Sequence, residues 1–252
     1  MTALRDAISF LTIVPFPCPL VNSDPSVRMC RALLWFPVVG AFIGAVGTGM
    51  IFLASKWWPS SIAAFLGLAG MVILTGGLHL DGFADSMDGL AAWKNREATL
   101  QVMRDSRIGA LGAAGLFLLL GLKWALIESI PIRHLAGTLI LVCASSRWAM
   151  VLSAQLFPYV PGKTGLGRLV TDRRSHPVVW MTSLLAIGIV FLGRGPLLGL
   201  LAIAFTGVVI WMLNRLFVRR LGGITGDTLG AVNEVVEVGL LLLLASWPWS
   251  LQ

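Results

Sequence analysis

The sequence predicts an all-α, polytopic transmembrane helix bundle of about seven spans plus an N-terminal interfacial helix, with residues 1–252 forming a single integral membrane domain. Of the 252 residues, 57% are apolar and only 12% are charged, about half the charge of a typical soluble domain. Residues 32–55, 57–80 and 195–214 are uncharged runs of 20 or more, enough to cross a hydrocarbon layer of ~30 Å. Because lipid offers the backbone no hydrogen bonds, these runs must be helical.

The elements follow in order from the distribution of charges and prolines. Residues 2–14 are expected to form a short amphipathic helix, because their apolar stretch is brief and is followed by three prolines, so no signal peptide is expected. The fifth and sixth spans share a very short connection, which leaves another odd total open. The spans are expected at about 32–55, 58–79, 108–129, 135–157, 177–193, 196–213 and 234–250.

The cations predict the orientation. Fourteen of the 19 lysines and arginines fall on the N-terminal side of the bundle, whereas only Lys56, Arg133 and Arg194 fall on the other side. Cytoplasmic segments of membrane proteins carry the excess of Lys and Arg, so the N-terminal side is expected to be cytoplasmic. The same loop cations explain the net charge of +7, and no nucleic-acid partner is expected. The three cysteines have no metal-ligand spacing or obvious pairing, so no disulfide framework is expected.

The acidic residues are concentrated in two windows on this side. Eight of the 12 lie within residues 81–105 and 227–237. If the second span continues as a helix, Asp81, Asp85 and Asp88 share one face at i, i+4 and i+7. Three adjacent carboxylates repel one another, whereas Mg²⁺ binds a few carboxylates and keeps places for water and substrate phosphate. We therefore expect the three to be metal ligands, with a solvated helix end as the alternative.

A loop that combines an acid with cations follows this window. Asp105 or Ser106 could cap the next span, and Asp105 is also a candidate further metal ligand or general base. Arg104 and Arg107 are candidate phosphate ligands, because phosphoryl transfer depends mainly on positioning and charge neutralisation. Asp88, Asp105 and Arg107 are thus the candidate catalytic residues.

The second window lies at the start of the last span. The uncharged run 238–252 has 15 residues and would span only about 22 Å, so the helix must begin earlier and include Glu234 and Glu237. Together with Asp227 they are expected to form a second acidic face that binds metal with the first. The preceding glycines, including Gly223 and Gly226, form either a backbone nest for pyrophosphate or an ordinary loop.

Two cations, Lys123 and Arg147, lie inside predicted spans. Intramembrane charges face a partner or a polar cavity, although a single long side chain can also extend outward to the interface. The two together indicate a polar chamber beneath the cytoplasmic acids that holds part of an anionic substrate.

Two long motifs stand out in the sequence. The first is His79-Leu-Asp-Gly-Phe-Ala-Asp85-Ser-Met-Asp88-Gly89 followed by Met103-Arg-Asp-Ser-Arg-Ile-Gly109. The second is Gly222-Gly-Ile-Thr-Gly-Asp227-Thr-Leu-Gly230 with Glu234 and Glu237. In these motifs the chain resembles the cobalamin synthase family, the adenosylcobinamide-GDP ribazoletransferases, and the similarity covers essentially the whole chain.

This resemblance implies a Mg²⁺-dependent enzyme of the bacterial cytoplasmic (inner) membrane whose active site faces the cytoplasm. It implies transfer of the adenosylcobinamide-phosphate group from adenosylcobinamide-GDP to α-ribazole or α-ribazole 5′-phosphate. The products are adenosylcobalamin, or its 5′-phosphate, and GMP. Association into a homo-oligomer or with other corrinoid-pathway enzymes is left open.

Three other functions agree less well with the sequence. Asp85-x-x-Asp88-Gly also resembles half of the CDP-alcohol phosphotransferase signature of lipid synthesis, but Ala92 stands where that signature has arginine. A transporter would explain the buried cations, but it predicts internal repeats, and the sequence shows none. A structural membrane subunit would have no need of paired carboxylates.

Overall fold

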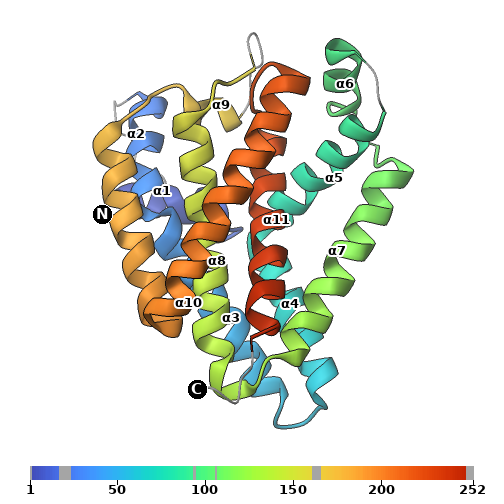
Figure 1. The fold of residues 1–252 in the computed structure, drawn as a ribbon, viewed down its shortest axis with the longest axis vertical. Helices are drawn as coiled ribbons and strands as arrows, with labels where there is room; N and C mark the ends of the chain where they lie inside the picture. The colour runs from blue at the N-terminus through green and yellow to red at the C-terminus, as the bar shows by residue number, and fades with distance from the viewer. Residues whose placement is uncertain (1, 17–23, 93–94, 106, 161–165, 248–252) are drawn as a thin grey trace.

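The computed structural model describes residues 2–16, 24–92, 95–105, 107–160 and 166–247, and this part of the chain is a helix bundle without a β-strand (Figure 1). The predicted all-α fold is therefore confirmed. The elements are α1 (Thr2–Leu11), α2 (Pro25–Ala32), the 3₁₀ helix η1 (Leu33–Trp35), α3 (Phe36–Ala54), α4 (Ser60–Thr75), α5 (Leu78–Ala91), α6 (Arg96–Val102), α7 (Ala110–Ser129), α8 (Ile132–Leu156), α9 (Leu166–Thr171), α10 (His176–Leu221) and α11 (Gly226–Ala245).

Within the described residues, five helices are long and apolar enough to cross a membrane, or six if the bent pair α4–α5 is one span. This total counts the 46-residue α10 once, although its helix is interrupted at Gly195, where φ is 80° and ψ is 174°. A Cβ added at Gly199 would contact the backbone of Phe191, so the chain reverses between them, and the two halves lie antiparallel in Figure 1. If the two halves were counted separately and the bent pair as one span, the total would be seven, the number that the sequence predicts.

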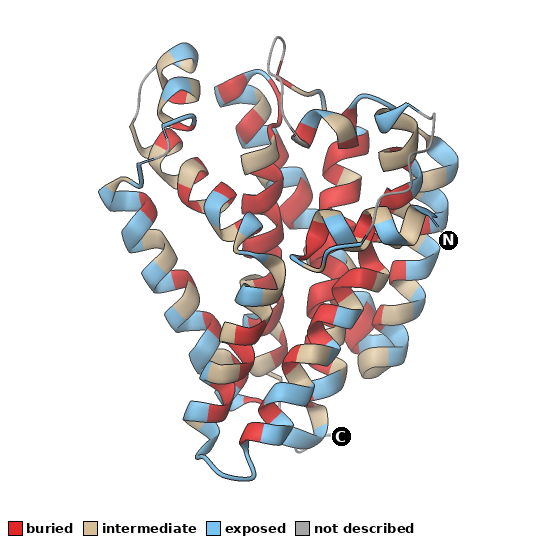
Figure 2. Cartoon of the chain, turned by 180° about the vertical axis from the view of Figure 1, so that it is seen from behind, coloured by how far each residue is buried: buried red, intermediate tan, exposed pale blue. Residues whose placement is uncertain are grey.

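The outer surface of the bundle is apolar, as lipid requires. Phe117 on α7 is 79% exposed and Leu192 on α10 is 89% exposed, whereas buried residues gather where helices face one another (Figure 2). An apolar exterior over several long helices describes a multi-pass membrane protein.

The central helix is α8, which packs against α3, α10 and α11 and is buried over most of its length. Gly40 and Gly44 of α3 allow this packing, because a Cβ at either position would collide with the backbone carbonyl of Cys143 or Leu139. Small residues let membrane helices approach closely in this way. The core is therefore held by backbone proximity as well as by apolar side chains.

The second predicted span does not continue straight into the acidic motif, but Asp81, Asp85 and Asp88 do share one helix, α5, as expected. The helix α4 ends at Thr75, and Gly76 and Gly77 take φ values of 61° and 68°, a left-handed conformation that favours glycine. The next helix, α5, is bent by 88° from α4. The bend lies against the N-terminal segment, since Ile13 N donates to Leu74 O at 2.9 Å.

The N-terminal helix α1 is shorter than the predicted segment but is amphipathic as expected. Ala7 and Leu11 are buried, whereas Arg5 is exposed. The helix is joined to α2 by an ion pair between Arg28 and Asp6 at 2.5 Å. The residue that reaches the bend, Ile13, follows α1 closely in the sequence.

Candidate active site

The two acidic helix ends meet where α5 packs against α11. A Cβ at Gly82 would lie 2.8 Å from the backbone oxygen of Asp227, and one at Gly230 would lie 3.0 Å from the backbone oxygen of His79. Glycines at both positions therefore bring the backbones into contact. The sequence predicts that the two acidic windows come together, and the structure shows this juxtaposition.

Local sequence determines how α11 begins. Thr225 caps the helix, because its Oγ1 accepts from Thr228 N at 3.2 Å while Thr225 N donates to Thr228 Oγ1 at 2.8 Å. Asp227 follows in the first turn and accepts from the Thr225 hydroxyl at 3.2 Å. A carboxylate in this turn is favourably placed at the positive end of the helix dipole.

A cavity of about 240 Å³ opens at this junction. Asp81 from the first turn of α5 and Asp227 from α11 both line it, together with His79 and Tyr159. Its apolar lining comes mainly from the opposite elements, among them Phe10, Leu33, Phe36, Met150 and Ala154. The cavity thus combines two carboxylates with an apolar wall.

The glycine-rich loop before α11 is packed against another loop. Ile224 N donates to Pro158 O at 2.8 Å, and Val160 N donates to Ile224 O at 3.0 Å. A Cβ at Gly223 would lie 2.7 Å from Pro158 O, so this glycine is used for loop contact, whereas Gly226 lines the cavity. The contact holds Tyr159 at the cavity, where burial and then the charge of Asp227 raise the pKa of its hydroxyl.

The remaining acids of the first motif have other surroundings. Within the described chain, only Asp81 of the three α5 acids lines the cavity. Asp85 is half-buried and has an interaction partner. The carboxylate of Asp88 accepts backbone hydrogen bonds from Gly109 at 2.8 Å and Gly112 at 2.7 Å.

The expectation that Asp105 caps the next span is wrong. The N-cap of α7 is Gly109, and the Asp88 carboxylate from α5 binds the N–H groups at that end. Asp105 instead pairs with Arg107 at 2.8 Å, and its hydrogen bonds with Arg107 lower the pKa of the Asp105 carboxyl to about 2. Both side chains and Arg104 are exposed. The other candidate cap, Ser106, lies outside the described residues.

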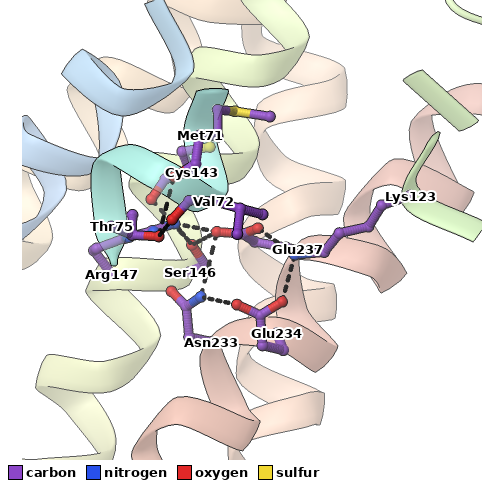
Figure 3. A network of polar contacts seen from close by, with 10 residues as sticks. All are labelled: Met71, Val72, Thr75, Lys123, Cys143, Ser146, Arg147, Asn233, Glu234 and Glu237. Atoms are coloured by element: carbon purple, nitrogen blue, oxygen red, sulfur yellow. Dashed lines mark hydrogen bonds and ion pairs between the residues drawn. The ribbon is translucent and has the colours of Figure 1, made fainter. Parts of the chain in front are cut away.

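The two buried cations are paired with the two glutamates of α11 (Figure 3). Lys123 Nζ lies 2.5 Å from Glu234 Oε2 and 2.6 Å from Glu237 Oε2. Arg147 Nη1 pairs with Glu237 Oε1. The side chains are almost fully buried, with Lys123 4% and Arg147 2% exposed, so neither cation extends outward to the interface.

Two neutral side chains complete this ion-pair network, which joins α7, α8 and α11. Ser146 Oγ lies 3.2 Å from Glu237 Oε1, and Asn233 Nδ2 donates to Glu234 at 3.1 Å and to Glu237 at 3.3 Å. Asn233 is not among the site residues predicted from the sequence. The position of this amide, directly before Glu234 in an apolar run, is a signal that could have indicated it. The network contains two positive and two negative charges, so its net charge is zero. This neutrality limits the free-energy cost of burying the four side chains in the membrane.

This pairing differs from the predicted roles of the four charged residues. A metal ion at Glu234 and Glu237 would have to displace the cations that already occupy them. A substrate anion at Lys123 or Arg147 would likewise have to displace a glutamate. Asp81 and Asp227 line the cavity of about 240 Å³, whereas the four charged residues of the network line a separate cavity of only about 30 Å³.

The donor set can be tested against a metal ion. Among the residues that the structure describes, no group of three His, Cys, Asp or Glu side chains is arranged to hold one. Mg²⁺, however, is commonly bound by one or two carboxylates, with water and substrate phosphate oxygens in the other positions. Asp81 and Asp227 offer two such hard oxygen donors on one cavity, so the residues fit a magnesium ion that arrives with a phosphorylated substrate.

Comparison with known proteins shows which family the chain is similar to. The family model described as cobalamin-5-phosphate synthase matches residues 3–245. An adenosylcobinamide-GDP ribazoletransferase of Desulforamulus reducens is 33% identical over 96% of this chain and 96% of its own length. Proteins of the same name from Klebsiella pneumoniae (strain 342) and Roseiflexus sp. (strain RS-1) are 37% and 35% identical, over 94% and 96% of this chain and 97% and 88% of their own lengths. No solved structure matches the chain.

Proposed function

The chain belongs to the cobalamin-5-phosphate synthase family, and from this we propose that it is an adenosylcobinamide-GDP ribazoletransferase that works at the cavity between α5 and α11. The reaction joins the adenosylcobinamide-phosphate group to α-ribazole, or its 5′-phosphate, and releases GMP. A hydroxyl oxygen of the ribose forms the new bond to the cobinamide-side phosphorus, the bond to the GMP oxygen breaks, and the hydroxyl proton passes to a base in the cavity and then to water.

One observation carries the assignment of the site: Asp81 and Asp227 line the same cavity although 146 positions separate them in the sequence. We place the diphosphate of the donor at these carboxylates, and Asp81 and Asp227 are the residues that would hold Mg²⁺. When bound, Mg²⁺ would supply neutralisation of the charge on the diphosphate and on the departing GMP. The two aspartates orient this end of the donor, and because they line the cavity they are the carboxylates to which the hydroxyl proton is assigned.

The apolar wall is assigned to the acceptor. The base of α-ribazole is a flat, weakly polar ring system, which suits the side chains of Phe10, Phe36 and Met150. A cavity of about 240 Å³ is below the usual range for a site that encloses a whole drug-sized ligand, roughly 300–1,000 Å³. The corrinoid, which is much larger, is therefore placed outside the cavity.

The predicted phosphate-binding and catalytic roles of Arg104, Asp105 and Arg107 remain part of this proposal. Their loop joins α6 to α7 and is exposed. Because phosphate binding by arginine needs a reachable guanidinium rather than a buried one, an exposed loop is compatible with recruitment of the nucleotide. The cation distribution supports a site that opens to the cytoplasm of a bacterial inner membrane.

The test is formation of GMP from adenosylcobinamide-GDP and α-ribazole by the purified protein in lipid, with and without Mg²⁺. We expect Asp81→Asn and Asp227→Asn to remove most activity while the protein remains inserted. Glu97→Gln is the matched control, because Glu97 is exposed on α6 and does not line the cavity.

Full activity in both aspartate variants would overturn the site, and wild-type activity independent of divalent metal would overturn the magnesium assignment. Release of CMP from a CDP-activated lipid, without GMP formation from the corrinoid donor, would replace the proposed reaction by a lipid phosphotransferase.

A further inference from the structure

The carboxylate of Asp88 is bound by the N-terminal backbone of α7. Its Oδ2 accepts from Gly109 N at 2.8 Å and its Oδ1 accepts from Gly112 N at 2.7 Å. The first N–H groups of a helix have no partner within that helix, and they lie at the positive end of its dipole. Asp88 therefore supplies from α5 the cap that the N-terminal residues of α7 do not supply.

Both donors are glycines, and the geometry explains why. A Cβ at Gly109 or at Gly112 would collide with the Asp88 carboxylate, and one at Gly112 would also lie 3.0 Å from Ala84 O. Glycine is otherwise unfavourable inside a helix. Its presence at position 112, in the first turn of α7, is accounted for by the close approach of α5.

Asp88 is poorly placed to share a metal ion with Asp81. Seven residues of helix separate them, which corresponds to about 10 Å along the axis, whereas Mg²⁺ lies only ~2 Å from its ligands. Both oxygens of Asp88 already accept hydrogen bonds, and in the described chain this residue does not line the cavity.

We propose that Asp88 is a positioning residue and not a metal ligand: its carboxylate fastens α5 to the start of α7 and thereby holds Asp81 opposite Asp227. The same clamp joins the two halves of the first motif, because the loop with Arg104 and Arg107 leads directly into the capped turn. The effect on turnover rests on the proposed function, whereas the clamp itself is a property of the fold.

The first experiment measures the clamp without any substrate. Amide hydrogen exchange of the protein in detergent should show Gly109 and Gly112 protected in the wild type and at least about ten-fold faster in Asp88→Asn, because a hydrogen bond to a charged group contributes about a factor of ten or more. Unchanged exchange at both amides would overturn the proposal, whatever reaction the protein catalyses.

The second experiment separates positioning from metal binding. Gly112→Ala displaces the carboxylate without altering it, whereas Gly121→Ala on the same helix, where a Cβ meets nothing, is the matched control. We expect Asp88→Asn and Gly112→Ala to lower kcat about equally, with an unchanged Mg²⁺ concentration for half-maximal rate, and the double variant to lose no more than either single variant.

If Asp88 were a metal ligand, Asp88→Asn would raise the Mg²⁺ concentration for half-maximal rate and Gly112→Ala would not. The losses of kcat in the two single variants would then add in the double variant. Either result overturns the proposal. A wild-type protein without ribazoletransferase activity would refute the proposed function instead, and the exchange measurement would still decide the clamp.

Discussion

Removing one charge from the buried ion-pair network should destabilise the protein strongly, and removing a matched opposite charge should restore most of the loss. Lys123 and Glu234 form the informative pair, because their joint removal leaves Arg147 and Glu237 as a neutral pair. Breaking a buried pair by removing one partner costs about 3–5 kcal/mol, chiefly because an uncompensated charge remains. We therefore expect a loss of this size in Glu234→Gln and in Lys123→Met.

The double variant should be much more stable than the sum of the single losses. Replacing both charges by uncharged groups leaves only lost packing and one unpaired amide, for which about 1–2 kcal/mol is reasonable. The assay is reversible unfolding in mixed micelles, followed by tryptophan fluorescence and analysed as a double-mutant cycle.

Losses that simply add, or single losses below about 1 kcal/mol, would refute the reasoning, because the charges would then be solvated or unpaired in the membrane. The cycle also addresses the metal-ligand role predicted for Glu234. A Glu234→Gln variant of normal stability whose turnover needs far more Mg²⁺ would favour metal binding over ion pairing.

Three further predictions follow from the site and from the bend. Gly82→Ala should lower turnover at least ten-fold with the protein still folded, because the added Cβ would push against the backbone of Asp227. The control is Gly49→Ala, where the added Cβ contacts no other atom. Equal turnover in the two variants would contradict the close approach of α5 to α11. Gly76→Ala should lower the free energy of unfolding by about 1 kcal/mol or more, since φ is 61° there; unchanged denaturant midpoints would refute the strain. Asp105→Asn should leave the shape of the rate–pH profile unchanged between pH 5 and 9, because a carboxyl with a lowered pKa of about 2 stays ionised throughout; loss of an acidic limb in this variant would show that Asp105 titrates there.

Much of the architecture can be predicted from the sequence because lipid imposes simple rules. The uncharged runs and the asymmetry of the cations indicate spans and sidedness directly. The break at Gly195 is also visible, since Pro196 follows Arg194 and a glycine in an otherwise apolar run. The bend at Gly76 and Gly77 is less visible, because residues 57–80 form one uncharged run whose length alone indicates a single straight span.

The partners of individual charges are harder to predict. The approach of Asp81 to Asp227 can be predicted, because both belong to acidic windows on one side of the membrane. The pairing of Lys123 with Glu234, 111 positions away, depends on which helices become neighbours, and one sequence carries no record of that. The same holds for Asp88, whose partners are backbone groups that could belong to any helix.

The order of synthesis gives the ion-pair network a consequence for assembly of the protein. The cations reside on α7 and α8, and both of their counter-ions reside on α11, which the ribosome makes last among the described helices. An unpaired Lys or Arg at the centre of a bilayer costs at least about 2.5 kcal/mol. Insertion of α7 and of α8 is therefore less favourable until α11 inserts and supplies the two glutamates. In a nascent chain interrupted before Gly226, Lys123 and Arg147 lack their glutamate partners. The native packing of α7 and α8 therefore depends on the synthesis of α11.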